Sequence, residues 1–196
     1  MEDLELIFFY KFLYNLIDIL NQFIITALPL DGLTLITRNS IEDRRGIFER
    51  LFCADELQEA GWTFPIAQIN HTITKKKGAV RGLHFQIESY AETKFITCLK
   101  GAVLDFAIDL RRESSTYLKW YAAELSPENQ TSLLIPEGFA HGFQTLLDDT
   151  ELIYLHSKPY SPNHEKGINI LDKKLNIQLP LSITEISDKD RDWPFL

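Results

Sequence analysis

The sequence predicts a mainly β protein whose strands form a double sheet or a closed barrel. About nine short runs of strand-type residues follow one another from residue 23 onward, and turn-forming residues separate them. No repeat, low-complexity stretch or linker divides these runs into two domains. Strands at this spacing are typical of a jelly roll, with a few short helices. An immunoglobulin-type sandwich is the alternative, although the surroundings of the two cysteines do not support it.

The first expected element is a helix in residues 1–22. This segment is apolar except for Lys11, Asn15, Asp18 and Gln22, whose spacing places them on one stripe of a helix. It begins with acidic residues and is interrupted by polar ones, which makes it a poor signal peptide and a poor membrane span. We therefore expect a helical extension that packs on the body of the fold or on a partner subunit, without membrane contact.

Residues 23–196 are expected to form a single domain of strands. Each expected strand is a short run rich in apolar, β-branched or aromatic residues. The runs are residues 32–37, 65–74, 79–86, 94–99, 102–110, 118–125, 131–135, 142–147 and 151–156. One short helix is expected at residues 54–60.

The alternation of side chains is clearest in residues 102–110. One face of this strand is apolar and carries Ala102, Leu104, Phe106, Ile108 and Leu110. The opposite face carries Val103, Asp105, Ala107 and Asp109. Asp105 is therefore a candidate partner for a histidine in a cavity.

Composition excludes several classes of function. The net charge is −8 and the pI is about 5.1, whereas general binders of nucleic acids or anionic membranes need a basic surface. Local basic groups can still bind a phosphate. The two cysteines, Cys53 and Cys98, have neither the number of a disulfide framework nor the spacing of a metal site, which fits the reducing cytoplasm.

Two segments resemble the paired motifs of metal-binding cupins, but two of the expected ligands are replaced. Those motifs supply His-x-His with a later Glu, and Pro-x-Gly-x-x-His. In this chain Gln86 replaces the second His and Lys94 replaces the Glu, whereas His84 and His141 are kept. An ammonium group has no lone pair to offer, and its charge repels a divalent metal. The remaining imidazoles and ammonium suit proton transfer beside an oxygen that becomes negative.

Several ordered motifs resemble the dTDP-4-dehydrorhamnose 3,5-epimerase family over residues 23–196. The most specific are residues 75–86 and 135–143, and the weaker ones are residues 43–48, 160–165 and 187–190. The resemblance implies a cupin-like jelly roll, usually a homodimer. It also implies inversion of C3 and C5 of a dTDP-linked 4-keto-6-deoxy sugar, without a metal or an organic cofactor.

The resemblance further implies a role for individual residues. His84 matches the base that removes a proton, and Asp190 matches the carboxylate that orients it. Lys94 matches the cation beside the keto oxygen, and Tyr154 matches the acid on the opposite face. The matches to substrate contacts are Arg45 and Arg81 for the diphosphate, Tyr160 for the nucleobase, and Gln68, Asn70, His141, Glu165 and Lys189.

Alternative interpretations exist for several of these residues. Tyr154 lies in a run that also suits an ordinary core strand. Asp190 lies in a charged tail of the kind that is usually solvated, where Asp188 and Asp192 are the alternatives. The lysines at residues 75–77 are expected to form an exposed hairpin turn. Arg50 stands where the family often has an acidic residue, so it would add positive charge near the nucleotide if it points inward.

The residues leave two other functions open. One is an epimerase that acts at C3 alone or C5 alone, or on another nucleotide sugar. This alternative is suggested by the altered sequence at residues 155–159, which follows Tyr154. The other is a sugar-nucleotide binding module without catalysis, although such a module needs no acid and base on opposite faces of its ligand.

Overall fold

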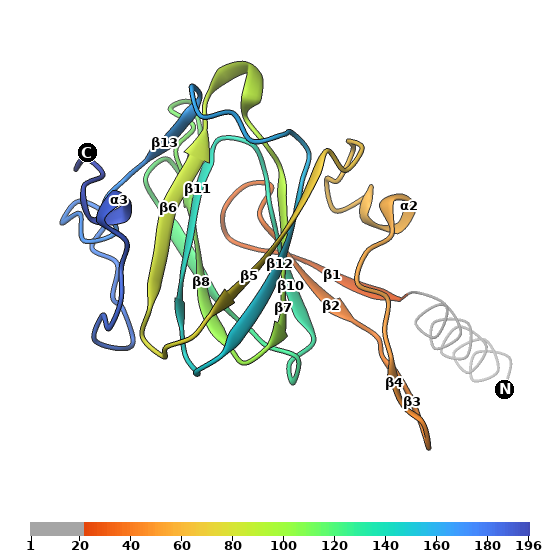
Figure 1. Cartoon of the computed structure of the whole chain (residues 1–196). Helices are drawn as coiled ribbons and strands as arrows, with labels where there is room; N and C mark the ends of the chain where they lie inside the picture. The colour runs from red at the N-terminus through yellow and green to blue at the C-terminus, as the bar shows by residue number, and fades with distance from the viewer. Residues whose placement is uncertain (1–21) are drawn as a thin grey trace, which may run out of the picture.

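The computed structural model describes residues 22–196, which form two facing β-sheets and a separate hairpin (Figure 1). The helix expected in residues 1–22 therefore lies outside the described residues, apart from Gln22. The hairpin consists of β3 (Ile41–Asp43) and β4 (Gly46–Phe48), and it extends away from the sheets. No helix in residues 22–196 is long and apolar enough to cross a membrane.

All strand pairs within the two sheets are antiparallel. The six-stranded sheet has the order β1 (Phe23–Ala27), β2 (Thr34–Arg38), β10 (Thr131–Ile135), β7 (Lys94–Lys100), β12 (Thr150–His156) and β5 (Gln68–Thr74). The five-stranded sheet has the order β13 (Glu165–Gly167), β6 (Val80–Gln86), β11 (Phe139–Thr145), β8 (Val103–Asp109) and β9 (Trp120–Leu125). The mainly β, double-sheet prediction is confirmed.

All nine expected strands are present, one with the expected ends (residues 131–135) and eight with shifted ends, but the expected helix at residues 54–60 is too long. The helix α2 covers only Ala54–Leu57. Beyond it, the backbone amides of Ala60 and Gly61 donate to carbonyls three residues earlier, so α-helical geometry ends there. The sequence did not reveal β1, β13 or the hairpin. A 3₁₀ helix at Glu88–Tyr90 and the helix α3 (Asp188–Arg191) complete the fold.

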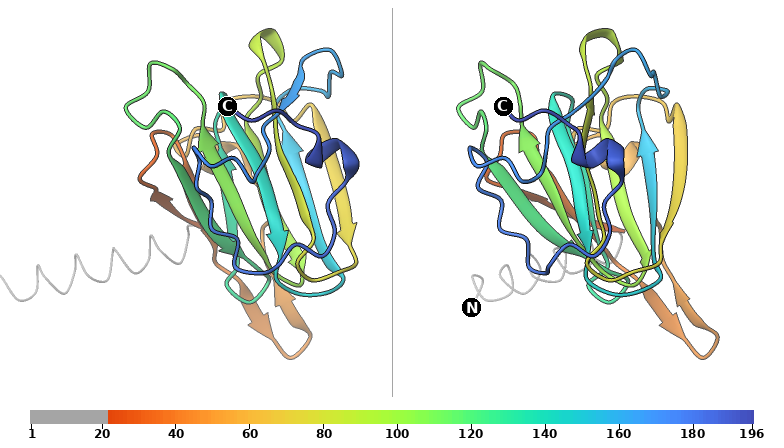
Figure 2. Two further views of the ribbon diagram at one scale, coloured as in Figure 1. Left: turned by 90° about the vertical axis from the view of Figure 1, so that its left-hand side faces the viewer. Right: turned by 60° about the vertical axis from the view of Figure 1, so that its left-hand side comes forward.

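The face of β8 that carries Asp105 points between the sheets. Val103 and Ala107 on this face belong to the central core with residues of the facing sheet such as Ile96 and Leu133. The other face is equally buried, because the C-terminal segment, residues 168–196, runs across the outside of the five-stranded sheet (Figure 2). Both faces of β8 are therefore covered, although its side chains alternate between apolar and mixed.

Two glycines allow β6 and β11 to approach closely. A Cβ atom on Gly82 would lie 2.6 Å from the Cα atom of Gly142, and one on Gly142 would lie 2.6 Å from the carbonyl oxygen of Arg81. Gly82 also has a φ of 106°, in the region that favours glycine. The pairing of these strands sets His84 directly opposite His141.

Candidate active site

A cavity of about 750 Å³ lies between the two sheets, and both sheets contribute side chains to its wall. The six-stranded sheet contributes Asn70, Thr72, Lys94, Tyr154 and His156. The five-stranded sheet contributes Arg81, His84, His141 and Phe143. The C-terminal segment contributes Ser187, Lys189 and Asp190. Residues from opposite sheets therefore face the cavity from two sides.

His84 and Asp190 are in direct contact although 106 residues separate them. The Asp190 Oδ1 atom lies 2.5 Å from His84 Nε2, and Asp190 Oδ2 accepts from the backbone amide of Gly82 at 3.2 Å. Ser187 caps the helix α3 by accepting from the backbone amide of Asp190. This short helix buries Asp190 and leaves the alternatives Asp188 and Asp192 exposed. Of the three carboxylates in residues 188–192, only that of Asp190 thus lies at the cavity wall.

The contact keeps Asp190 ionised and indicates which nitrogen of the His84 ring faces it. Burial alone would raise the pKa of Asp190, but the hydrogen bond and charge of His84 outweigh it and lower that pKa. An ionised carboxylate only accepts hydrogen bonds, so we assign the imidazole proton to Nε2. His84 Nδ1 then carries the lone pair, which is the requirement for a base.

Lys94 is buried at the cavity wall and is paired with a carboxylate. Its Nζ atom lies 3.2 Å from Glu92 Oε1 and donates to the backbone carbonyl of His84 at 3.3 Å. Only 7% of Lys94 is exposed. The ammonium is therefore held at a defined point beside His84.

The residues at the cupin metal positions do not fit a divalent metal. Gln86 is buried, and its amide is fully used by the backbone: Oε1 accepts from Ser161 at 2.6 Å, and Nε2 donates to the carbonyls of Tyr90 and Pro159. Lys94 brings a positive charge to the other replaced position. Within residues 22–196, no three histidine, cysteine or acidic side chains are grouped as metal ligands would be.

Tyr154 approaches the cavity from the sheet opposite His84. Its hydroxyl lies 3.2 Å from Thr72 Oγ1, and only 8% of the residue is exposed. Burial raises the pKa of the Tyr154 phenol above its ordinary value of 10. The side chain is therefore a protonated donor at neutral pH. It belongs to the core cluster as well as to the cavity wall, so a place in a core strand and a place in the site are compatible.

Asp105 contacts a cavity histidine, as the alternation of its strand predicted. Its Oδ2 atom lies 2.8 Å from His141 Nε2, and no part of the residue is exposed. Burial raises the pKa of Asp105, and the nearby His141 opposes that shift. The His141 ring is thus held at the cavity wall by a buried carboxyl group.

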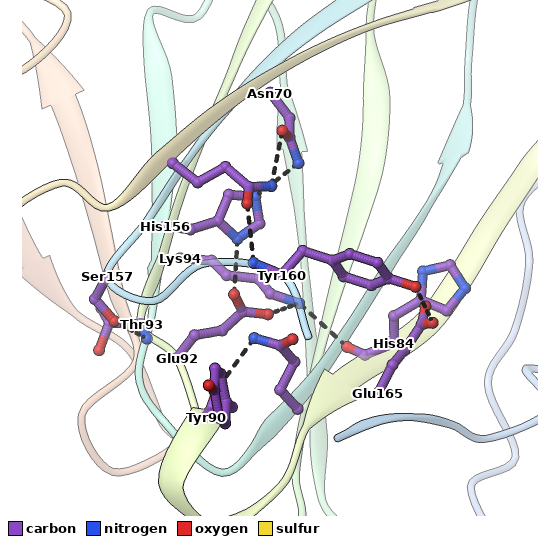
Figure 3. A network of polar contacts seen from close by, with 12 residues as sticks. Asn70, His84, Tyr90, Glu92, Thr93, Lys94, His156, Ser157, Tyr160 and Glu165 are labelled. Atoms are coloured by element: carbon purple, nitrogen blue, oxygen red, sulfur yellow. Dashed lines mark hydrogen bonds and ion pairs between the residues drawn. The ribbon is translucent and has the colours of Figure 1, made fainter. Parts of the chain in front are cut away.

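Five predicted substrate contacts are linked by hydrogen bonds near the loop that follows β12. The Tyr160 hydroxyl donates to Glu165 Oε2 at 2.7 Å, and the Lys189 ammonium donates to both oxygens of Glu165. Figure 3 shows the Tyr160 hydroxyl directed at Glu165. Tyr160 is 52% exposed, so a flat ligand can reach its ring. Gln68 accepts from the backbone amide of Tyr160, and Asn70 is hydrogen-bonded to Gln68.

Basic residues surround another part of the cavity. Arg81 lies on the wall, where its Nε atom donates to Thr74 Oγ1 at 3.1 Å. The lysines of residues 75–77 are exposed in a turn, as expected, and Lys75 and Lys76 also line the cavity. Lys76 is paired with Glu185. This part of the wall carries the positive charge that a diphosphate requires.

The structure does not bring Arg45 or Arg50 to the cavity of its own chain. Arg45 lies at the turn of the β3–β4 hairpin, is 85% exposed at its side chain, and pairs with Asp43. Arg50 pairs with Glu56 on the helix α2. Neither arginine belongs to the cavity wall. Arg50 therefore does not point inward within this chain.

Sequence reasoning missed Glu92, Thr72 and the contact role of His156. His156 stands two residues after Tyr154 and shares its face of β12, and Glu92 stands two residues before Lys94, just ahead of β7. This spacing of two residues from a predicted site residue was the signal in the sequence that could have found Glu92 and His156. The contact between Glu92 and His156 joins residues 64 positions apart, so the sequence of one segment cannot predict it.

Proteins with similar sequences identify the family of this chain. The sequence profile of the dTDP-4-dehydrorhamnose 3,5-epimerase family matches residues 27–196. The chain belongs to this family. A dTDP-4-dehydrorhamnose 3,5-epimerase of Shigella flexneri is 44% identical over 149 residues, which cover 76% of this chain and 82% of that protein.

Solved structures of relatives share the fold. The dTDP-4-dehydrorhamnose 3,5-epimerase of Bacillus anthracis, solved with TDP and PPi bound, superposes with a TM-score of 0.86 at 36% identity, covering 89% of this chain and 99% of that one. A 3'-monoepimerase from Streptomyces bikiniensis, solved in complex with dTDP-quinovose, has a TM-score of 0.80 at 32% identity, covering 86% and 85%. The family thus includes enzymes that act at both carbons and enzymes that act at one.

Proposed function

We propose that this protein is an isomerase that inverts C3 and C5 of dTDP-4-dehydro-6-deoxyglucose and so forms dTDP-4-dehydrorhamnose. The observation that carries the proposal is the pairing of His84 with Asp190 on one side of the cavity, opposite the protonated Tyr154 on the other. Membership of the family supports the same reaction.

The proposed reaction uses each group once per carbon. His84 Nδ1 takes the proton next to the ketone, the electrons of the C–H bond form an enolate, and Asp190 stabilises the charged imidazole. The Lys94 ammonium stabilises the enolate oxygen. Tyr154 then gives its proton to the carbon from the opposite face, which inverts the centre. Solvent restores the proton of Tyr154 and removes the one from His84.

We propose that the substrate contacts implied by the resemblance hold the nucleotide while the sugar lies between His84 and Tyr154. Tyr160 offers an exposed ring to the nucleobase, and Arg81 offers a guanidinium to the diphosphate. Gln68, Asn70, His141, Glu165 and Lys189 complete the proposed contacts.

Incubation with dTDP-4-dehydro-6-deoxyglucose in deuterated water tests the reaction. We expect deuterium at both C3 and C5, detected by NMR or mass spectrometry, and formation of dTDP-4-dehydrorhamnose. Absence of label at both carbons contradicts the proposal. Binding of the nucleotide sugar that is unchanged by His84→Ala, with no exchange in the unmodified protein, would instead favour a binding module.

An epimerase that acts at C3 alone is the second candidate. Curated relatives that are 33–35% identical to this chain include 3-epimerases of Streptomyces. The same experiment separates the two functions, because label at C3 without label at C5 selects the second.

We also propose that the protein is a cytoplasmic homodimer in which the β3–β4 hairpin contacts the partner. Ile41, Ile47 and Phe48 on this hairpin are each more than half exposed, which favours a covered position in an assembly. Contact with a partner also gives a reason for Arg45 to lie away from its own cavity. In a symmetric pair each hairpin would reach the other subunit, so Arg45 would contact the diphosphate in the cavity of the partner. The cytoplasmic location is supported by the two free cysteines.

A further inference from the structure

A chain of hydrogen bonds that ends in an ion pair runs from the Tyr160 loop to Lys94, through residues to which the proposed reaction assigns no chemical step (Figure 3). Its links are Tyr160 N to Gln68 Oε1 at 2.9 Å, Gln68 Nε2 to Asn70 Oδ1 at 3.0 Å, Asn70 Nδ2 to His156 Nε2 at 3.3 Å, His156 Nδ1 to Glu92 Oε2 at 2.9 Å and Glu92 Oε1 to Lys94 Nζ at 3.2 Å. It connects the proposed nucleobase contact with the proposed enolate contact.

The direction of every hydrogen bond in this chain is determined. The backbone amide of Tyr160 can only donate, so it fixes the amide of Gln68, and Gln68 in turn fixes the amide of Asn70. The Asn70 NH₂ group then donates to His156 Nε2, which places the imidazole proton on Nδ1. Nδ1 donates to Glu92, which as a carboxylate only accepts. The neutral form of His156 therefore satisfies both of its neighbours.

Glu92 and His156 are enclosed, so their contact is a strong constraint. The Glu92 side chain is 8% exposed and the His156 side chain is 11% exposed. Burial would raise the pKa of Glu92, but the hydrogen bond from His156 and the charge of Lys94 outweigh burial and lower it. The carboxylate stays ionised and attracts the ammonium.

The Lys94 ammonium has three donors, and the protein uses two of them. One faces Glu92 and one faces the backbone carbonyl of His84. Because Lys94 also lines the cavity, the third donor is the one available to a substrate oxygen. Holding two donors restricts rotation of the ammonium and so fixes the direction of the third.

We propose that Glu92 is a positioning residue that directs one N–H of Lys94 into the cavity, and that His156, held by Asn70, fixes Glu92 for this task. The proposal rests on the enolate role proposed for Lys94. A fixed donor stabilises negative charge that develops in the transition state without reorganising first, so its loss lowers kcat more than it raises KM.

Paired variants test the proposal through steady-state kinetics. Glu92→Gln cannot accept from both His156 and Lys94, and we expect kcat to fall about ten- to a hundredfold while KM changes less than about threefold. Glu88→Gln, a change of an exposed glutamate nearby, is the matched control and should leave both values unchanged. His156→Leu should reproduce the loss, and His156→Asn, which keeps a donor close to the position of Nδ1, should restore most of kcat.

An NMR measurement on the substrate-free protein separates this proposal from the proposed function. In ¹⁵N-labelled protein we expect His156 as the neutral Nδ1–H tautomer. We expect this tautomer to persist in Glu92→Gln, because Asn70 still donates to Nε2 and the new amide oxygen can accept from Nδ1. A wild-type protein that moves no substrate proton would refute the reaction, yet the tautomer would still report on the chain. The positioning role is overturned by a proton on Nε2, by an unchanged kcat in Glu92→Gln, or by equal loss in both His156 variants.

Discussion

At the scale of single residues, the carboxylate beside His84 decides which ring nitrogen is the base. In Asp190→Asn the side-chain amide can donate to Nε2 and move the imidazole proton to Nδ1, where it blocks proton abstraction. We expect kcat to fall about 10³- to 10⁴-fold with folding intact. Deuterium exchange at C3 and C5 measures the loss. Asp188→Asn on the exposed side of the same helix is the control, and a similar loss there would contradict the assignment.

Tyr154 allows the two halves of the reaction to be separated. Tyr154→Phe removes the acid and leaves His84 and Lys94 in place, so the enolate should still form. We expect the substrate carbon still to exchange its hydrogen for deuterium on the face that His84 contacts. Formation of the inverted product should fall about 10²- to 10⁴-fold. NMR of the same sample follows both quantities. Product formation at the wild-type rate would mean that another group delivers the proton.

At the scale of elements, Gln86 connects the strand β6 to the loop that carries Tyr160. Gln86→Leu leaves the backbone groups of Tyr90, Pro159 and Ser161 without their partner. An unsatisfied group costs about 1–3 kcal/mol where it is fully buried, and less at these partly buried positions. We expect a Tm lower by several degrees and a higher KM, because the ring that stacks on the nucleobase is no longer held. Calorimetry and kinetics check the two effects. An unchanged KM would show that the loop is fixed by other contacts.

Elements with a strong local pattern could be predicted, and those that depend on distant pairing could not. Residues 102–110 alternate clearly, so the strand followed from period alone, and Asp105 on the face opposite the apolar stripe was a candidate partner for a cavity histidine. The strand β13 has three residues and exists because it pairs with β6, which no local pattern reveals. The Glu92–His156 pair was missed for the same reason, since it forms only when strands from different regions meet. The resemblance identified Asp190, whereas its charged surroundings alone predicted a solvated tail.

At the scale of the whole molecule, Glu92 and Asp190 link stability to pH. Both carboxyl groups have a lower pKa in the folded protein than their ordinary values of 4.5 and 3.8. The unfolded chain therefore binds more protons as the pH falls, and the stabilisation is full above about pH 5 and is lost below it. We expect urea unfolding midpoints to fall between pH 7 and pH 3.5, and to fall less in the double variant Glu92→Gln with Asp190→Asn. An equal fall in both proteins would assign the acid sensitivity to other groups.

The exposed hairpin leads to the prediction about assembly. In the proposed homodimer the side chain of Phe48, now 65% exposed, becomes buried against the partner, so Phe48→Asp places a charge in an apolar contact. We expect sedimentation to detect monomers in this variant at concentrations where the wild-type protein is dimeric. Arg45→Ala should leave the dimer intact and raise KM, because only the proposed diphosphate contact is removed. The two variants separate assembly from substrate binding. A wild-type protein that sediments as a monomer with full activity would remove the reason for exchanging hairpins, and Arg45 would then have no proposed role in catalysis.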